Sequence, residues 1–145
     1  MSGERHRIEV DDAYVMAIGR AVFVFSVLEW NAAFCCDRLE PGYLRTVEQK
    51  KRTAGGIAGD LLAQIQGLPA KDPRHACRDA AVRFDELVEV RNALMHGRPG
   101  TAEGGKQRLF RDGDDWTIAE IEEAADQFAA CSIELGDLLH GVLAP

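Results

Sequence analysis

The stretch RNALMHG, residues 91–97, combines residue types that suit phosphate binding and proton transfer. An arginine guanidinium presents a planar fork that can bind two phosphate oxygens at once. A histidine imidazole exchanges its proton near neutral pH, as a general acid or base must. Asn92 and His96 are four residues apart, so the Asn92 amide can hydrogen-bond the imidazole while the helix lasts. The stretch therefore predicts a site that binds a phosphate at Arg91 and moves a proton at His96.

Arg91 also interrupts an apolar stripe. A helix that begins near Asp72-Pro73 places Phe84 on its core side, and Arg91 follows seven residues later on the same line. A buried guanidinium is costly unless it is paired or opens onto a cleft. The acid in the most apolar surroundings is Glu29, within FVFSVLEWNAAF, so we expect Glu29 and Arg91 to form an ion pair. The alternative is that such a pair is a structural contact that only sets the register of two helices.

His96 has a structural explanation of its own. A histidine at the C-terminus of a helix interacts favourably with the helix dipole, and Gly97 and Pro99 end the helix there. The grouping of Arg91, Asn92 and His96 at one helix end is what favours a functional site over this simpler reading.

The six residues RNALMH, 91–96, resemble the R-[polar]-x-x-x-H motif of the HEPN superfamily, the higher eukaryote and prokaryote nucleotide-binding domains. The resemblance covers residues 12–143 loosely, and only these six residues match closely. It implies an all-α, usually dimeric domain with the motif near the end of a bundle helix. Many such domains are metal-independent ribonucleases of toxin–antitoxin, abortive-infection and CRISPR systems. Others have lost catalysis and serve as scaffolds or nucleotide binders.

The expected function is therefore a metal-independent endoribonuclease, with a toxin–antitoxin or phage-defence system as its setting. Arg91 and His96 would be catalytic, Asn92 and Glu29 would support them, and no metal or other cofactor is expected. Attack of a ribose 2′-hydroxyl on the adjacent phosphate needs both a base and an acid, which two copies of His96 in a homodimer would supply. The expected partners are RNA, a second copy of the chain and an antitoxin protein. The alternatives are a non-catalytic dimeric module that binds a nucleotide or a partner, and a purely structural helical dimer.

The first predicted helix begins at Asp11-Asp12 and runs to Leu39. Its core-side apolar residues recur every three or four positions, and its other side is also apolar, with Val22, Val24, Val27 and Trp30. A helix that is apolar around most of its girth is covered on two sides. In a chain of 145 residues we expect the second cover to be another subunit.

A second helical region is predicted over about residues 44–65. Its glycines Gly55, Gly56 and Gly59 predict a break or a close helix crossing, because glycine weakens a helix. The third helix is the one that carries the RNALMHG stretch.

The region before the last helix is predicted to contain a hairpin. Residues 100–105 are expected to form a flexible loop, and Asp112-Gly113 supplies the turn of a short hairpin. Thr117 and Glu120 then have the spacing of a capping box. The predicted fold is an all-α, antiparallel helical bundle with a short β-hairpin before the last helix, in a single domain over residues 1–145.

Composition sets further bounds. The net charge of −7 argues against a protein that coats nucleic acid by bulk attraction, but it leaves room for a local basic site. The four cysteines form no C-x-x-C pair and lie among apolar neighbours, so buried thiols are expected. His6, His75 and His140 also lack a partner at metal-ligand spacing. No leader sequence or membrane span is predicted, so a cytoplasmic location is expected.

Overall fold

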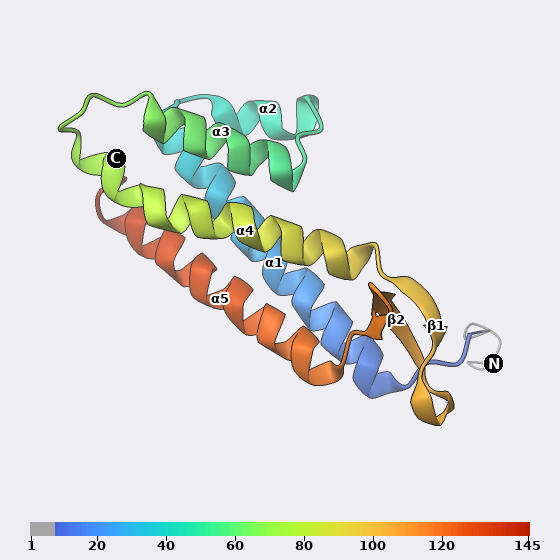
Figure 1. The fold of residues 1–145 in the computed structure, drawn as a ribbon. Helices are drawn as coiled ribbons and strands as arrows, with labels where there is room; N and C mark the ends of the chain where they lie inside the picture. The colour runs from blue at the N-terminus through green and yellow to red at the C-terminus, as the bar shows by residue number, and fades with distance from the viewer. Residues whose placement is uncertain (1–7) are drawn as a thin grey trace.

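The computed structural model describes residues 8–145, so His6 and the rest of residues 1–7 lie outside the described part of the chain. The fold is mostly helical, with one small antiparallel sheet before the last helix (Figure 1). This agrees with the predicted all-α fold containing a short hairpin. The helices are α1 (Asp12–Leu39), α2 (Tyr43–Gln49), α3 (Ala54–Gln66), α4 (Arg78–Met95) and α5 (Ile118–His140), and a 3-10 turn, η2 (Pro73–Cys77), precedes α4.

The three long helices run up, down and up, so α1 and α5 are parallel neighbours (Figure 1). At one end the Tyr14 hydroxyl donates to the Trp116 carbonyl at 2.7 Å, just before α5 begins. Further along, the Asn31 amide donates to the Ser132 hydroxyl at 2.9 Å. Helix α4 is antiparallel to α1 and to α5, as predicted. Helices α1 and α5 are parallel to each other, which was not predicted. With three long helices that reverse direction in turn, the first and third must point the same way.

The core lies between α1, α4 and α5. The Phe25 ring of α1 stacks on Phe84 of α4 at 6.2 Å and meets Phe128 of α5 edge-on at 5.0 Å. The predicted stripe of α4 is buried as far as Leu94, but Met95 is 48% exposed. Met95 lies in the last turn of α4, and the rest of residues 8–145 leave this side of the turn uncovered.

The four cysteines are free and buried. Burial raises the pKa of the Cys35 and Cys36 thiols to about 12 and that of Cys131 to about 11, and it also raises the pKa of Cys77. The thiols are therefore protonated and pack as small apolar groups, as the sequence predicts.

The second helical region is divided into α2 and α3, but its glycines do not cause the division. The break falls at residues 50–53, where Lys51 has a positive φ of 49° and the Thr53 hydroxyl caps α3. Gly55 and Gly56 lie in the first turn of α3, after the break. A Cβ at Gly59 would meet nothing within 4 Å, so that glycine does not mark a close helix crossing either.

The sheet has three strands in the order β1 (Arg98–Thr101), β2 (Gln107–Arg111) and β3 (Asp114–Asp115). The predicted turn between β2 and β3 is confirmed, with positive φ at Asp112 and Gly113. Strand β1 was not predicted, because proline and glycine are poor strand residues. Proline is tolerated at this edge of a sheet. The capping box at the start of α5 is confirmed, since Thr117 and Glu120 exchange side-chain and backbone hydrogen bonds.

One side of α1 carries apolar side chains that residues 8–145 leave exposed. We call this set the α1 outer face: Val15, Met16, Val22, Phe23, Val27, Trp30 and Phe34. By length and composition alone, α1 is also the one helix among the described residues that could cross a membrane. In the fold it is the central helix, in contact with α2, α3, α4 and α5.

Candidate functional site

The end of α4 positions His96. The His96 N–H donates to the Asn92 carbonyl at 2.9 Å, which is the last turn of the helix. The chain then turns directly into β1, because Arg98 precedes Pro99 and a residue before proline favours extended backbone. The His96 side chain is exposed at this corner. The helix exit therefore presents an imidazole beside the sheet.

Gly97 allows the sheet to approach the helix end. A Cβ at Gly97 would lie 2.9 Å from the Leu109 Cβ and 3.1 Å from the Leu94 carbonyl oxygen. Its φ is not positive, so the requirement is space and not a left-handed backbone. The sequence suggested a helix stop at Gly97. The structure adds that only a glycine lets β2 pack so closely against the end of α4.

His96 lines a cleft of about 310 Å³ between the end of α4 and the sheet. We call it the hairpin cleft. Two arginines, one aspartate and a phenylalanine join the histidine there, so with a neutral imidazole the charged side chains sum to one positive charge. Its lining residues are Ala93, His96, Arg98, Phe110, Arg111, Asp112 and Gly113.

Arg91 occupies a different environment. Its guanidinium carbon lies 4.8 Å from the centroid of the Phe25 ring, a cation–π contact with the core. The side chain is half-buried, and its Nε atom is buried without a hydrogen-bond partner in residues 8–145. An unpartnered buried donor is costly, so this arginine is held on the core at the expense of stability.

Glu29 lies near Arg91 without touching it. Burial raises the pKa of the Glu29 carboxyl, and the positive charge of Arg91 lowers it by a smaller amount. The two groups are not among the ion pairs formed by the described residues, so the expected Glu29–Arg91 ion pair was wrong for a single chain. Glu29 instead lines a cavity of about 200 Å³ together with Trp30, Glu48 and Arg52.

The four predicted site residues are thus only partly brought together. Arg91 and His96 are five positions apart, which separates them by about 140° around a helix. Arg91 faces α1, whereas His96 faces the sheet. Asn92 is half-buried, and its contact with His96 is the backbone bond described above. The expected bond from the Asn92 amide to the imidazole does not form.

Three residues of the hairpin cleft were missed by reasoning from the sequence: Arg98, Phe110 and Arg111. Their signal was present in the segment RLFR, in which two arginines flank two apolar residues, and in the arginine that directly follows Gly97. It was overlooked because β1 was not recognised, so nothing paired Arg98 with Phe110. In the sheet these two residues are directly opposite each other.

Two arginines of β2 fix the sheet to the helices. Each makes one salt bridge and one cation–π contact with an aromatic ring. Arg108 is buried, donates to the Asp11 carboxylate at 2.5 Å, and lies 4.1 Å from the centroid of the Tyr14 ring. Arg111 lies 4.0 Å from the centroid of the Trp116 ring and 4.0 Å from the Glu120 carboxylate. The hydrogen bond to Arg108 holds the pKa of Asp11 below its usual value.

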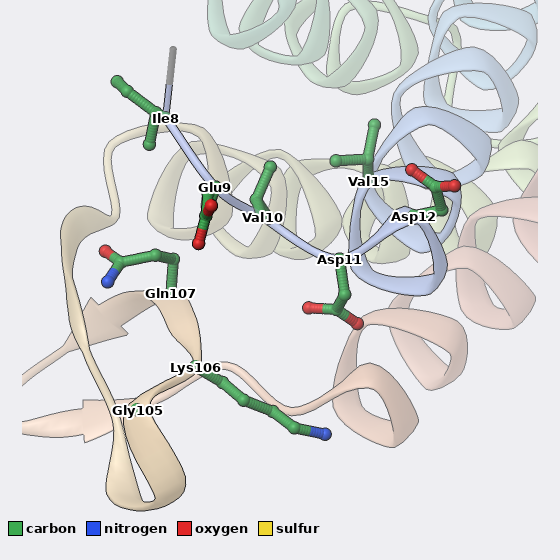
Figure 2. A pocket seen from close by; sticks show the side chains of 9 residues that line it. All are labelled: Ile8, Glu9, Val10, Asp11, Asp12, Val15, Gly105, Lys106 and Gln107. Carbon is green, nitrogen blue, oxygen red and sulfur yellow. The ribbon is translucent and has the colours of Figure 1, made fainter. Parts of the chain in front are cut away.

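A larger cavity, about 510 Å³, lies between the residues before α1 and the loop after β1. Figure 2 shows residues 8–11 lying beside the loop that carries Gly105 and Lys106. Glu9, Asp11 and Asp12 line it against a single lysine, and Asp11 is already bonded to Arg108. Its negative charge disfavours a phosphate ligand, so the hairpin cleft is the better candidate for a phosphate site.

Comparisons with protein-family models, with curated proteins and with solved structures gave no match.

Proposed function

We propose that the protein is a metal-independent endoribonuclease of HEPN type that acts as a cytoplasmic homodimer. The observation that carries this proposal is the end of α4. There Arg91 is held against the Phe25 ring with an unpartnered donor, and five residues later His96 emerges into a cleft with two arginines. The RNALMH motif predicts phosphate and proton chemistry at the same residues.

The proposed reaction needs no metal. One His96 takes the proton of a ribose 2′-hydroxyl, and the 2′-oxygen bonds to the adjacent phosphorus. The bond from phosphorus to the 5′-oxygen breaks, and that oxygen receives a proton from His96 of the partner subunit. The products are a 2′,3′-cyclic phosphate and a free 5′-hydroxyl. Arg91 would balance the negative charge that develops on the phosphorane oxygens.

The α1 outer face supports the homodimer. It gathers seven exposed apolar side chains on one helix, and Phe23 among them is 72% exposed. Trp30 and Phe34 form a tilted aromatic pair with centroids 6.3 Å apart. A contiguous apolar patch on a soluble protein marks an interaction surface. A second copy would cover the patch and bring a second motif into the same assembly.

The setting rests on the resemblance alone. It points to a toxin of a toxin–antitoxin or phage-defence system, which an antitoxin protein would restrain. We propose a cytoplasmic location, and the contacts of α1 with four other helices support it.

A non-catalytic dimeric module that binds a nucleotide or a partner is the second candidate. The placement of Arg91 and His96 in different environments of one chain favours it, as does the net charge of −7. A nucleotide that raises the melting temperature through Arg91, with no turnover, would select this function.

The test is cleavage of 5′-labelled RNA by the purified protein in the presence of a chelator. We expect products that end in a 2′,3′-cyclic phosphate, a bell-shaped pH profile, and no cleavage of DNA. His96→Ala should lose at least about 100-fold in rate because general acid–base catalysis contributes that much. Arg91→Ala should lose as much or more, and Asn92→Ala should lose less.

His140→Ala is the matched control, because His140 is an exposed histidine in the last turn of α5, at the opposite end of that helix from the sheet. Its cleavage rate should equal that of the wild type. Cleavage that persists unchanged in folded His96→Ala would refute the assignment of this histidine.

A further inference from the structure

We propose that the hairpin cleft is the subsite that binds the single-stranded RNA substrate, with one base stacked on Phe110 and adjoining phosphates on Arg98 and Arg111. This inference rests on the proposed function, which gives His96 the proton transfer but does not say what holds the RNA. It adds a substrate class, unpaired RNA, and three binding residues from a sheet that the sequence motif does not include.

The cleft is built from two elements that meet at the histidine. His96 ends α4, while Arg98 follows in β1 and Phe110 and Arg111 lie in β2. All four line the same space of about 310 Å³. A nucleotide held by the sheet would therefore place its ribose and phosphate next to the imidazole.

Phe110 is fixed in place as a stacking platform. It lies directly opposite Arg98 in the β1–β2 register, and paired residues share one face of a sheet. Gly100 leaves room for the ring, since a Cβ at Gly100 would lie only 3.0 Å from the Phe110 Cε1 atom. The ring is half-buried and lines the cleft. Among residues 8–145 no arginine lies over the Phe110 ring, whereas arginines cover the rings of Tyr14, Phe25 and Trp116.

The two arginines supply the charge that a phosphate chain requires. Arg111 follows Phe110 in β2, so its side chain leaves the other face of the strand. The Trp116 ring and the Glu120 carboxylate hold it there, and it borders the cleft from that side. Arg98 is exposed and makes no ion pair with any described residue. Asp112, in the β2–β3 turn, lies in the same cleft, and Glu120 pairs with Arg111, so Arg98 is the arginine of this cleft that has no carboxylate partner among the described residues.

Single-stranded RNA fits this arrangement better than a duplex does. Proteins bind unpaired strands by combining a basic groove with aromatic rings on which bases stack. In a duplex the bases are stacked on one another and unavailable to Phe110, and the deep groove of A-form RNA does not admit side chains. The cleft should therefore prefer unpaired RNA, and purines over pyrimidines because they stack more strongly.

The test measures binding separately from cleavage. The probe is a fluorescein-labelled 2′-O-methyl oligoadenylate, whose blocked 2′-oxygen cannot attack, and anisotropy gives its Kd for the wild-type protein. Phe110→Leu should weaken binding roughly tenfold, while Phe110→Tyr, which keeps the ring, should bind like the wild type. Arg98→Gln and Arg111→Gln should each reduce the dependence of log Kd on log salt by about 0.7, the value for one phosphate contact on a single strand.

Arg45→Gln is the matched control, because Arg45 is an exposed arginine on α2, remote from the sheet. It should leave Kd and its salt dependence unchanged. Thermal melting of every variant shows whether it is folded, and Arg98→Gln removes no contact from the fold.

The outcomes separate this inference from the proposed function. If the Phe110 and arginine variants lose binding and the wild type cleaves no RNA, the subsite proposal stands and the ribonuclease proposal is refuted. Cleavage that depends on His96, with binding and KM unchanged in the three variants, would refute the subsite and keep the ribonuclease. Equal binding of a duplex of the same length would also overturn the subsite, since Phe110 could not then be stacking a base.

Discussion

At the scale of single residues, Arg91 and His96 are placed by different forces. Arg91 stays on the core side of α4 because its planar guanidinium can lie over the Phe25 ring, 4.8 Å away. His96 leaves the helix because α4 ends there and the chain enters β1. Replacing a buried charged side chain by an apolar one of similar volume often costs little stability, so packing alone does not require an arginine at this position. Its buried, unpartnered Nε atom is consistent with a role in binding.

Glu29 is expected to weaken the fold at neutral pH. Burial raises the pKa of its carboxyl above the ordinary 4.5, and the opposing influence of Arg91 is smaller. The folded protein thus binds the Glu29 proton more tightly than the unfolded chain does. Ionised Glu29 therefore lowers the free energy of unfolding, and this loss is recovered as the pH falls through the folded pKa to below 4.5.

The corresponding variant is Glu29→Gln. It should raise the free energy of unfolding at neutral pH and change it little below pH 4.5, as measured by urea unfolding at both conditions. Glu86→Gln, at an exposed position of α4, controls for the change in net charge. A fall in stability at neutral pH for Glu29→Gln would instead mean that Arg91 stabilises the carboxylate more than burial destabilises it.

At the scale of elements, the sheet is what builds a cleft beside the helix end. Tyr14 ties it to α1, since its hydroxyl accepts from the Leu109 N–H at 3.1 Å and donates to the Trp116 carbonyl. Arg108 adds its ion pair with Asp11. These bonds and the contact at Gly97 determine how far β2 lies from His96.

Gly97→Ala tests that spacing. The new Cβ would lie 2.9 Å from the Leu109 Cβ, so β2 must move away from α4. We expect a loss of about 1–3 kcal/mol in the free energy of unfolding, as for other overpacked sites, together with slower RNA cleavage. Denaturant unfolding and the cleavage assay measure the two effects.

Gly59→Ala provides the comparison at a helical glycine with open space around it. It should stabilise the protein by about 0.5–1 kcal/mol because alanine loses less backbone entropy in a helix. Destabilisation by both substitutions to the same extent would show that the effect at Gly97 does not come from contact with the sheet.

At the scale of the whole molecule, the dominant feature is a central helix that the chain covers on one side. The core side of α1 is buried by α3, α4 and α5, while the α1 outer face stays exposed. A second copy on that face would bury the aromatic side chains and supply the second histidine that acid–base catalysis requires.

Phe23→Glu should therefore dissociate the proposed dimer. A carboxylate at the centre of an apolar interface has no partner and must be desolvated. Light scattering should give about twice 15.9 kDa for the wild type and about 15.9 kDa for this variant, which should also lose RNA cleavage.

Ile133→Glu makes the same change of charge on α5, at a side chain that is 66% exposed and outside the α1 outer face. Its mass and activity should match those of the wild type. A wild type that is monomeric at micromolar concentration would contradict both the dimer and the composite site.

The sequence by itself determined the long helices and the place of the RNALMH stretch at the end of one of them. Periodic apolar residues set α1, α4 and α5, and the capping box at Thr117 and Glu120 set where α5 begins, because these signals act over one or two helical turns. The anomaly of Arg91 was visible as a break in such a period.

Only the tertiary structure decided what surrounds the motif. Contacts between residues far apart in the chain decide whether Glu29 reaches Arg91. Such contacts also decide whether Arg98 pairs with Phe110. Strand β1 contains proline and glycine, and it forms because β2 and the end of α4 hold it there. Local propensity could not reveal this, since the free energy that favours the strand comes from its neighbours and not from its own residues.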